Sequence, residues 1–316
     1  MGEFTLERIN IALAADNNYA QHVAVVIASV MKNIKADSTV RFFLLSDGIA
    51  KEMLERIGAT AASLQAELSV IDLSTASGFE TLYTSGHISR AAYFRLALPD
   101  ILPADVSKII YCDVDLLVLG DITELWSFDL QGLPLAAVAD YGIMASKRLM
   151  QQKHNVIGLP MDYRYFNSGV LVIDVDAWRA NGYAKDVIEL AASGNLPHHD
   201  QDALNKVFMG KWQELPLRWN VIPPIIDLLP KILFNGKFRA GAVAARRAAA
   251  ILHYAGRYKP WEFVCTQGFN EQYYAYLAAT AFAAEPMPKP GKNMQGKSLT
   301  RQLLRIKLAN FISDML

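Results

Sequence analysis

The amino-acid sequence predicts an α/β fold in which a mostly parallel central sheet is flanked by helices. In the first half of the 316 residues, short apolar runs alternate with segments whose apolar residues recur at helical spacing. Such alternation is typical of β-α-β units with parallel strands. The chain is 52% hydrophobic and carries no net charge, which suits one large core and argues against nucleic acid as a partner.

The first elements run from residue 9 to residue 113. The run INIALAAD at 9–16 predicts a buried strand, and the segment after it, up to residue 33, predicts an amphipathic helix. We expect strands at 40–47 and 67–73, with a helix over 50–58 between them. Residues 89–102 predict a helix, and a strand that ends at Asp113 follows it.

The pattern is less regular after residue 130. We expect strands at 133–140 and 166–178, then a helix through Val187 and Leu190, and another helix that begins near Asp200. The adjacent pair His198 and His199 predicts a polar helix start rather than a metal site, because neighbouring histidine side chains point apart. The segment 221–250 has no clear assignment.

Asp113 and Asp115 stand within the apolar run KIIYCDVDLLVLGD at 108–121. Buried ionised carboxylates are costly unless they are paired or bind a metal. Either a strand ends in a turn and both acids are solvated, or the strand carries both to a cation, since residues i and i+2 face one side. Ligands of open parallel sheets bind beyond the carboxyl ends of the strands, and both Asp16 and Asp113 are expected there. This placement favours a cation site.

Common motifs of nucleotide-binding, zinc-binding and phosphatase classes are absent or differ from this sequence. The sequence contains no G-x-G-x-x-G after a strand, no phosphate-binding loop, no H-E-x-x-H and no cysteine pair for zinc. Phosphatases of the haloacid dehalogenase type also use Asp-x-Asp, with the first Asp as nucleophile. Their motif continues with Thr or Val where this chain has Leu117, and it lies near the N-terminus. Both differences count against a phosphatase.

A second motif, HYAGRYKPW at 253–261, is more specific than Asp-x-Asp. Together with ALAADNNY, ISRAAYFRL, FNSGV and HDQDALN, it resembles glycosyltransferase family 8 over roughly residues 9–261. Within the family, the likeness is to bacterial lipooligosaccharide and lipopolysaccharide α-galactosyltransferases. The resemblance implies a GT-A (Rossmann-like) catalytic domain at 9–284, with a nucleotide-sugar half at about 9–130 and an acceptor half at about 131–284.

The resemblance also implies the reaction. A hexose, galactose or glucose, passes with retention of configuration from a UDP-sugar to a lipid-linked or oligosaccharide acceptor such as a lipopolysaccharide core. Asp113, Asp115 and His253 are implied as ligands of Mn²⁺ or Mg²⁺, and an imidazole nitrogen beside two carboxylates favours Mn²⁺ over Ca²⁺. The alternative is a self-glycosylating priming protein of the glycogenin type, which needs an acceptor tyrosine near its site.

The remaining implied site residues surround the donor. The nucleotide positions are matched by Ala14, Ala15, Asp16, Asn18, Tyr19 and Val114, the diphosphate positions by Gly256 and Lys259, and the reacting positions by Arg95, Asn167, Asp200 and Gln201. Arg95 on its own would predict a salt bridge on a helix surface. Because an amide is a poor nucleophile, Gln201 favours same-face attack over a double displacement.

Residues 285–316 differ from the rest. A proline-rich hinge precedes a predicted basic amphipathic helix, in which Leu304, Leu308, Phe311, Ile312 and Met315 form an apolar stripe. Such a helix is typical of an anchor on an anionic membrane surface; the alternatives are packing on the body or on a second copy. No signal peptide or membrane span is predicted, and the two cysteines suit a reducing compartment. We therefore expect a cytoplasmic protein associated peripherally with the inner membrane face.

Overall fold

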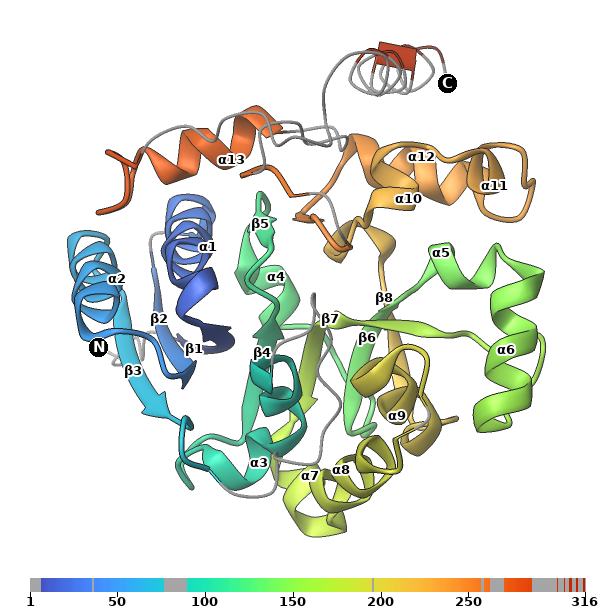
Figure 1. Ribbon diagram of the computed structural model, residues 1–316, viewed down its shortest axis with the longest axis horizontal. Coiled ribbons are helices and arrows are strands. Elements are labelled where there is room, and N and C mark those ends of the chain that lie inside the picture. Colours follow the sequence, from blue (N-terminus) through green and yellow to red (C-terminus); the bar gives the residue numbers. More distant parts are fainter. Residues whose placement is uncertain are drawn as a thin grey trace, which may run out of the picture.

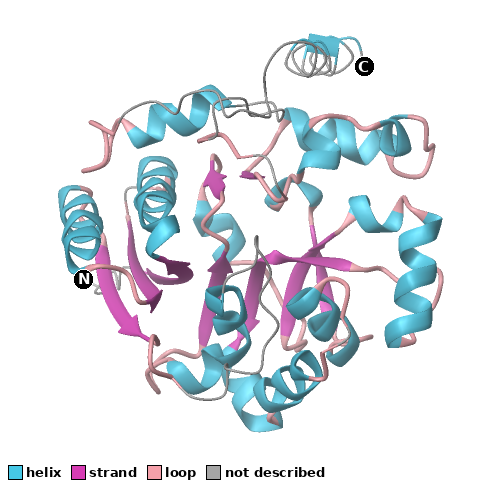
Figure 2. Ribbon diagram, viewed as in Figure 1, coloured by secondary structure: helices cyan, strands magenta, loops and turns pink. Residues whose placement is uncertain are grey.

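The central element of the computed structural model is a seven-stranded sheet with the order β3-β2-β1-β4-β7-β6-β8, covered by helices (Figure 1). The structure describes residues 7–35, 37–76, 90–194, 196–256, 259–261, 270–285, 300, 304, 307, 308, 311 and 315. Figure 2 shows the strands as one continuous layer between helices. The predicted mostly parallel sheet flanked by helices is confirmed. Because this sheet includes strands from both sides of residue 130, the division into two halves stays a prediction.

The first four strands of the sheet are parallel to one another. They are β1 (Glu7–Asp16), β2 (Ser38–Asp47), β3 (Glu67–Asp72) and β4 (Lys108–Cys112), and the helices between them include α1 (Ala20–Asn33) and α2 (Lys51–Ser63). Alternate residues of β1 pack on opposite faces of the sheet. Ile11 and Leu13 join the core that contains α1, while Ala12 and Ala14 join a second core around Tyr93.

One strand of the second half runs against its neighbours. The remaining strands of the sheet are β6 (Leu135–Ala139), β7 (Phe166–Asp174) and β8 (Trp212–Leu215). β7 is antiparallel to both β4 and β6, with Cys112 paired to Val170. The first residues of β7 therefore lie at the same edge of the sheet as the last residues of β1 and β4. This direction brings the FNSGV segment to the edge where ligands of such sheets bind.

One predicted element is confirmed with a different helix type, and two others are wrong. The helical segment expected at 89–102 is present, but its first part is the 3-10 helix η2 (Arg90–Ala97), and the α-helix α3 (Leu98–Ile101) follows it. The strand expected at 166–178 ends at Asp174, whose side chain accepts a hydrogen bond from the Ala177 amide and starts α7 (Val175–Asn181). β4 ends at Cys112, so Asp113 and Asp115 follow the strand instead of lying on one of its faces.

A small second sheet lies beyond β4. It pairs β5 (Leu116–Val118) antiparallel with β9 (Ile251–His253). The segment 221–250, unassigned from the sequence, forms α10 (Pro223–Ile226), α11 (Pro230–Leu233) and α12 (Arg239–Arg247) before reaching β9. The other helices are η1 (Asn17–Tyr19), α4 (Ile122–Trp126), α5 (Tyr141–Met144), α6 (Lys147–Ile157), α8 (Tyr183–Ala192), α9 (His199–Val207), η3 (Leu217–Trp219) and α13 (Asn270–Leu277).

The C-terminal segment is described only in part. Residues 300, 304, 307, 308, 311 and 315 are helical, and Leu304, Leu308, Phe311 and Met315 expose between 57% and 71% of their surface. Ile312 and most of the predicted basic residues lie outside the described residues, as does Cys265. Within the described part of the chain, no helix combines the length and the apolar character that crossing a membrane requires.

Candidate active site

A cavity of about 700 Å³ opens where β1 and β4 end and β7 begins. All the residues assigned to the site from the sequence line this one cavity: Ala14, Ala15, Asp16, Asn18, Tyr19, Arg95, Asp113, Val114, Asp115, Asn167, Asp200, Gln201, His253, Gly256 and Lys259. They come from six separate segments of the chain. The fold therefore gathers them in one place, although the role of each remains a prediction.

Asp113, Asp115 and His253 converge on one point of the cavity wall. Their ligating atoms lie within 4.8 Å of one another, and no other such group of His, Cys, Asp and Glu occurs among the described residues. The pairing of β5 with β9 causes this, because it aligns Leu116 with His253. The Tyr254 amide also donates to the Asp115 carbonyl at 2.8 Å. A histidine from late in the chain is thus fixed beside the two acids.

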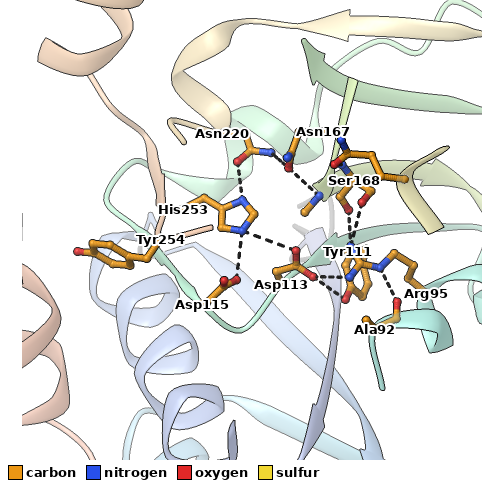
Figure 3. A network of polar contacts seen from close by, with 12 residues as sticks. Ala92, Arg95, Tyr111, Asp113, Asp115, Asn167, Ser168, Asn220, His253 and Tyr254 are labelled. Atoms are coloured by element: carbon orange, nitrogen blue, oxygen red, sulfur yellow. Dashed lines mark hydrogen bonds and ion pairs between the residues drawn. The ribbon is translucent and has the colours of Figure 1, made fainter. Parts of the chain in front are cut away.

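Asn220 sets the orientation of the His253 ring (Figure 3). Its side-chain oxygen lies 2.9 Å from His253 Nδ1, and its amide nitrogen donates to Asn167 Oδ1 at 2.8 Å. Because the oxygen of Asn220 can only accept, the proton of the neutral ring is on Nδ1. The Nε2 lone pair then faces Asp115 Oδ1 at 3.1 Å and Asp113 Oδ2 at 3.7 Å. Two carboxylates and one imidazole lone pair suit a divalent cation.

Basic side chains balance the two carboxylates. Asp113 Oδ1 lies 2.8 Å from Arg95 Nη2 and accepts a hydrogen bond from the Tyr111 hydroxyl at 2.9 Å. Asp115 forms an ion pair with the Lys259 ammonium. Burial alone would raise the pKa of Asp115, but the Lys259 ammonium outweighs burial and holds this pKa well below its ordinary range. The Asp115 carboxylate is therefore charged and available to a cation.

Arg95 is a buried residue that joins two parts of the site. Its side chain is 6% exposed, so the helix-surface salt bridge expected from its position alone is wrong. Besides Asp113, it contacts Asp200 Oδ2 through Nε at 3.3 Å and donates to the Ser168 carbonyl at 2.7 Å. Burial raises the pKa of Asp200, and Arg95 opposes this rise. Arg95 thus holds the β4 end, the β7 start and the α9 start together.

The amide of Gln201 is held at both ends. Its oxygen accepts from the Ser168 backbone amide at 3.1 Å, and its nitrogen donates to Asp140 Oδ2 at 3.3 Å. The Asn167 amide donates to the same carboxylate oxygen at 3.3 Å. Asp140 itself begins α5 by accepting from the Ile143 amide, and it lies behind the cavity wall. It therefore positions Gln201 and Asn167.

Gly169 allows the closest approach in the site. A Cβ atom at this position would lie 2.3 Å from His253 Cε1 and 2.7 Å from Asp113 Oδ2, far inside van der Waals contact. The Gly169 carbonyl accepts from the Asp113 amide at 2.8 Å. Sequence reasoning missed both Gly169 and Asn220. The FNSGV motif contained a signal for the glycine, whereas no local pattern marks Asn220.

The nucleotide end of the cavity is formed after β1. Asp16 Oδ1 accepts from the backbone amides of Asn18 at 2.9 Å and Tyr19 at 3.3 Å, which starts η1. The Tyr19 ring packs edge-on against Trp261, with centroids 5.9 Å apart. Gly256 has φ of 89°, in the left-handed region that favours glycine. Together these contacts shape the wall where the sequence predicted uridine and diphosphate.

Comparisons with known proteins identify the class as a glycosyltransferase with a GT-A-type fold. The model of the family "Glycosyl transferase family 8" matches residues 10–265. The chain therefore belongs to glycosyltransferase family 8. Membership in a transferase family decides against the phosphatase alternative.

Individual relatives cover most of the chain. General stress protein A of Bacillus subtilis is 31% identical over 281 residues, which is 87% of this chain and 94% of that protein. Lipopolysaccharide 1,2-glucosyltransferase of Escherichia coli K12 is 27% identical over 261 residues, 81% of this chain and 74% of that protein. The crystal structure of the galactosyltransferase LgtC with donor and acceptor sugar analogues superposes with a TM-score of 0.74 at 27% identity, covering 90% and 99% of the two chains.

Proposed function

We propose that the protein transfers galactose or glucose from a UDP-sugar to a saccharide or glycolipid acceptor, such as a lipopolysaccharide core, with retention of configuration. The observation that carries the proposal is the convergence of Asp113, Asp115 and His253 beside the cavity of a family 8 chain. Relatives named as a lipopolysaccharide glucosyltransferase and a galactosyltransferase support the substrate class. They leave both hexoses as candidates.

The proposed cation is Mn²⁺ or Mg²⁺, held by Asp113, Asp115 and His253. When bound, a divalent cation stabilises the negative charge that grows on the departing diphosphate without any proton transfer. Lys259 serves the same leaving group, since its ammonium already lies against Asp115 at the cavity wall. Burial lowers the pKa of Lys259, but Asp115 outweighs burial and the net shift is upward, so the amine is charged.

The reacting centre is proposed to lie beside Arg95, Asn167, Asp200 and Gln201. Gln201 has both amide atoms engaged with protein groups, so it supports the oxocarbenium-like centre by orientation and does not attack it. Asp200 is paired with Arg95 at 3.3 Å. No side chain here is offered as a free nucleophile, which supports same-face attack by the acceptor hydroxyl over a covalent intermediate.

The tail is proposed to hold the enzyme at an anionic membrane surface. The exposed Leu304, Leu308 and Phe311 are apolar side chains on a helix that the sequence makes basic. Such a helix adsorbs to a membrane interface through apolar burial and attraction to anionic lipid. A glycolipid acceptor would be presented at that surface.

A UDP-release assay with UDP-galactose, UDP-glucose and UDP-N-acetylglucosamine in the presence of Mn²⁺ tests the proposal. We expect release with one or both hexoses, a faster rate with a saccharide acceptor, and loss of release with chelator. Intact-mass analysis after the same incubation separates transfer to an added acceptor from self-glycosylation of the glycogenin type, which would add hexose masses to the protein. Absence of release from all three donors would refute the proposal.

A further inference from the structure

A fully buried lysine lies behind the cavity wall and has no part in the reaction described above. Lys153 of α6 is 0% exposed, and its Nζ lies 2.7 Å from Oδ1 and 2.8 Å from Oδ2 of Asp202 in α9. The hydroxyl of Tyr165 donates to Asp202 Oδ1 at 2.6 Å. The third neighbour of the ammonium is Nδ1 of His198, at 2.5 Å. A buried charge is costly unless it is compensated. Since all three contacts of the Lys153 ammonium are made by Asp202 and His198, we ask what this lysine does for these two residues.

The arrangement determines which ring nitrogen of His198 carries a proton. An ammonium has three N–H donors and no acceptor. Burial lowers the pKa of Lys153 and Asp202 opposes this effect, while the contacts of Nζ with both Asp202 oxygens, at 2.7 and 2.8 Å, are those of an ammonium in an ion pair. Nδ1 of His198 must therefore accept, and the proton of the neutral ring is on Nε2. Burial is the main cause that lowers the pKa of His198, and Lys153 lowers it further. Together they outweigh Asp202 and Asp140, which raise this pKa. The ring is thus held neutral.

His198 lines the cavity, where its Nε2–H can act as a hydrogen-bond donor. It lies two residues before Asp200 in the chain, and Nε2 is the ring nitrogen that does not contact Lys153. The backbone amide of His198 donates to Asp202 Oδ2 at 2.9 Å, so the residue is held by its main chain as well as its ring. His199, the next residue, has φ of 45°, a left-handed conformation that is uncommon outside glycine. The start of α9 is therefore a constrained turn directed at the cavity.

We propose that Lys153 and Asp202 hold His198 as a neutral imidazole whose Nε2–H donates a hydrogen bond to a hydroxyl group of a saccharide in the cavity. His198 is the binding residue, and Lys153 acts through it as a positioning residue. A sugar hydroxyl accepts such a bond, and a neutral donor selects it without attracting phosphate as a cation would. The saccharide identity of the ligand rests on the proposed function, whereas the state of the ring does not.

The ring state is measured directly by NMR of protein labelled with ¹⁵N-histidine, with the His198 signals assigned by their loss in His198→Phe. We expect an Nε2-protonated neutral ring in the wild type at pH 7, and a mixture of tautomers in Lys153→Met. Since Lys153→Met leaves Asp202 unpaired and can impair folding, Lys153→Met with Asp202→Asn serves as a second, charge-neutral variant. An imidazolium or an Nδ1-protonated ring in the wild type would overturn the proposal, whether or not UDP-sugar turnover is found.

Kinetics identify the hydroxyl. His198→Phe retains a ring but removes the donor, while His198→Gln keeps an N–H donor. We expect KM to rise about 5- to 10-fold in His198→Phe and to recover partly in His198→Gln. If the KM of His198→Phe for the UDP-sugar rises in acceptor-free hydrolysis, the hydroxyl belongs to the donor. If only the KM for the acceptor rises, the hydroxyl belongs to the acceptor. His154→Phe, on the exposed side of α6, is the control. Unchanged KM values for both substrates in a folded His198→Phe would overturn the proposal, whereas an inactive wild type would instead refute the proposed function.

Discussion

The side-chain oxygen of Asn220 lies 2.9 Å from Nδ1 of His253, on the side of the imidazole ring opposite the two carboxylates. Histidine ligands are commonly oriented by such a second hydrogen bond, which fixes the tautomer and increases the basicity of the ligating nitrogen. Asn220 is 1% exposed and is itself held by Asn167. The relationship makes Asn220 part of the candidate metal centre, although it does not face the cation.

Replacing Asn220 by Ala should therefore weaken Mn²⁺ binding by about 10- to 100-fold, because His253 loses its orientation. Isothermal titration of Mn²⁺ in the presence of UDP measures the effect. Asn33→Ala, which removes a partly buried amide that donates to Val118 and Tyr276, is the matched control and should bind Mn²⁺ normally. Equal affinity in a folded Asn220→Ala protein would contradict this role.

Asp115→Asn should lower metal-dependent turnover by at least about 100-fold, since a cation stabilises the leaving group by several kcal/mol. The substitution removes one anion from the cation and leaves Lys259 without its ion-pair partner. The control is Asp121→Asn, because Asp121 accepts from the Thr123 amide at the start of α4 and Asn caps a helix equally well. UDP release at increasing Mn²⁺ concentration distinguishes the two. Full activity of Asp115→Asn at low Mn²⁺ would exclude this ligand.

Gly169→Ala should inactivate the enzyme while the rest of the fold persists. The new Cβ would lie 2.3 Å from His253 Cε1 and 2.7 Å from Asp113 Oδ2, so that the candidate ligands must separate. Gly58→Ala in α2 is the control, since nothing lies within 4 Å of a Cβ there and alanine is the better helix former. Circular dichroism and Mn²⁺ titration of both variants provide the measurement. A Gly169→Ala protein with normal Mn²⁺ affinity would show that the close approach is unimportant.

His22 should make the stability of the fold depend on pH. It is 5% exposed, its Nδ1 lies 2.6 Å from the Tyr273 hydroxyl, and Trp261 stacks on it at 3.5 Å. Burial lowers the pKa of His22 to about 3, whereas in the unfolded chain the value is about 6.5. Between these values the unfolded state binds a proton that the folded state does not. Stability is therefore lost as pH falls below about 6.5, by up to about 1.4 kcal/mol per pH unit.

His22→Asn removes this titration while keeping a polar group near Tyr273. We expect a lower free energy of unfolding at pH 7.5 but a shallower decline between pH 6 and pH 4.5, measured by urea denaturation. His154→Asn on the exposed side of α6 should leave the wild-type slope unchanged. An identical slope in the His22→Asn protein would mean that His22 does not carry the pH dependence.

Deleting residues 291–316 should leave acceptor-free hydrolysis of UDP-sugar intact and reduce binding to anionic vesicles. The segment contains Lys292, Lys297, Arg301, Arg305 and Lys307, and each basic residue near such a surface is worth about 1 kcal/mol. Added salt should mimic the deletion for the intact protein. Flotation with phosphatidylglycerol vesicles, compared with uncharged phosphatidylcholine vesicles, measures the effect. Equal flotation of both proteins would identify the tail as a packing element.

Local patterns in the sequence predict the alternation of strands and helices, the class of fold and the residues that gather at the cavity. Apolar periodicity is a local property of the chain, so the strands β1, β2 and β4 could be predicted to within a few residues. The motifs around Asp113 and His253 could be matched without knowing how they meet. The same local reasoning misplaced the two acids on a strand face, because it could not tell that β4 ends at Cys112.

The contacts that hold these residues in place arise from the way distant parts of the chain pack together. The antiparallel direction of β7 places Gly169 against His253, and the pairing of β5 with β9 joins Asp115 to a residue far along the chain. Asn220 and Lys153 have no sequence signal at all, since an isolated Asn or Lys is ordinary on any surface. Their importance lies in contacts across 33 residues to His253 and 45 residues to His198. Such contacts follow from the order and direction of strands, which no local pattern specifies.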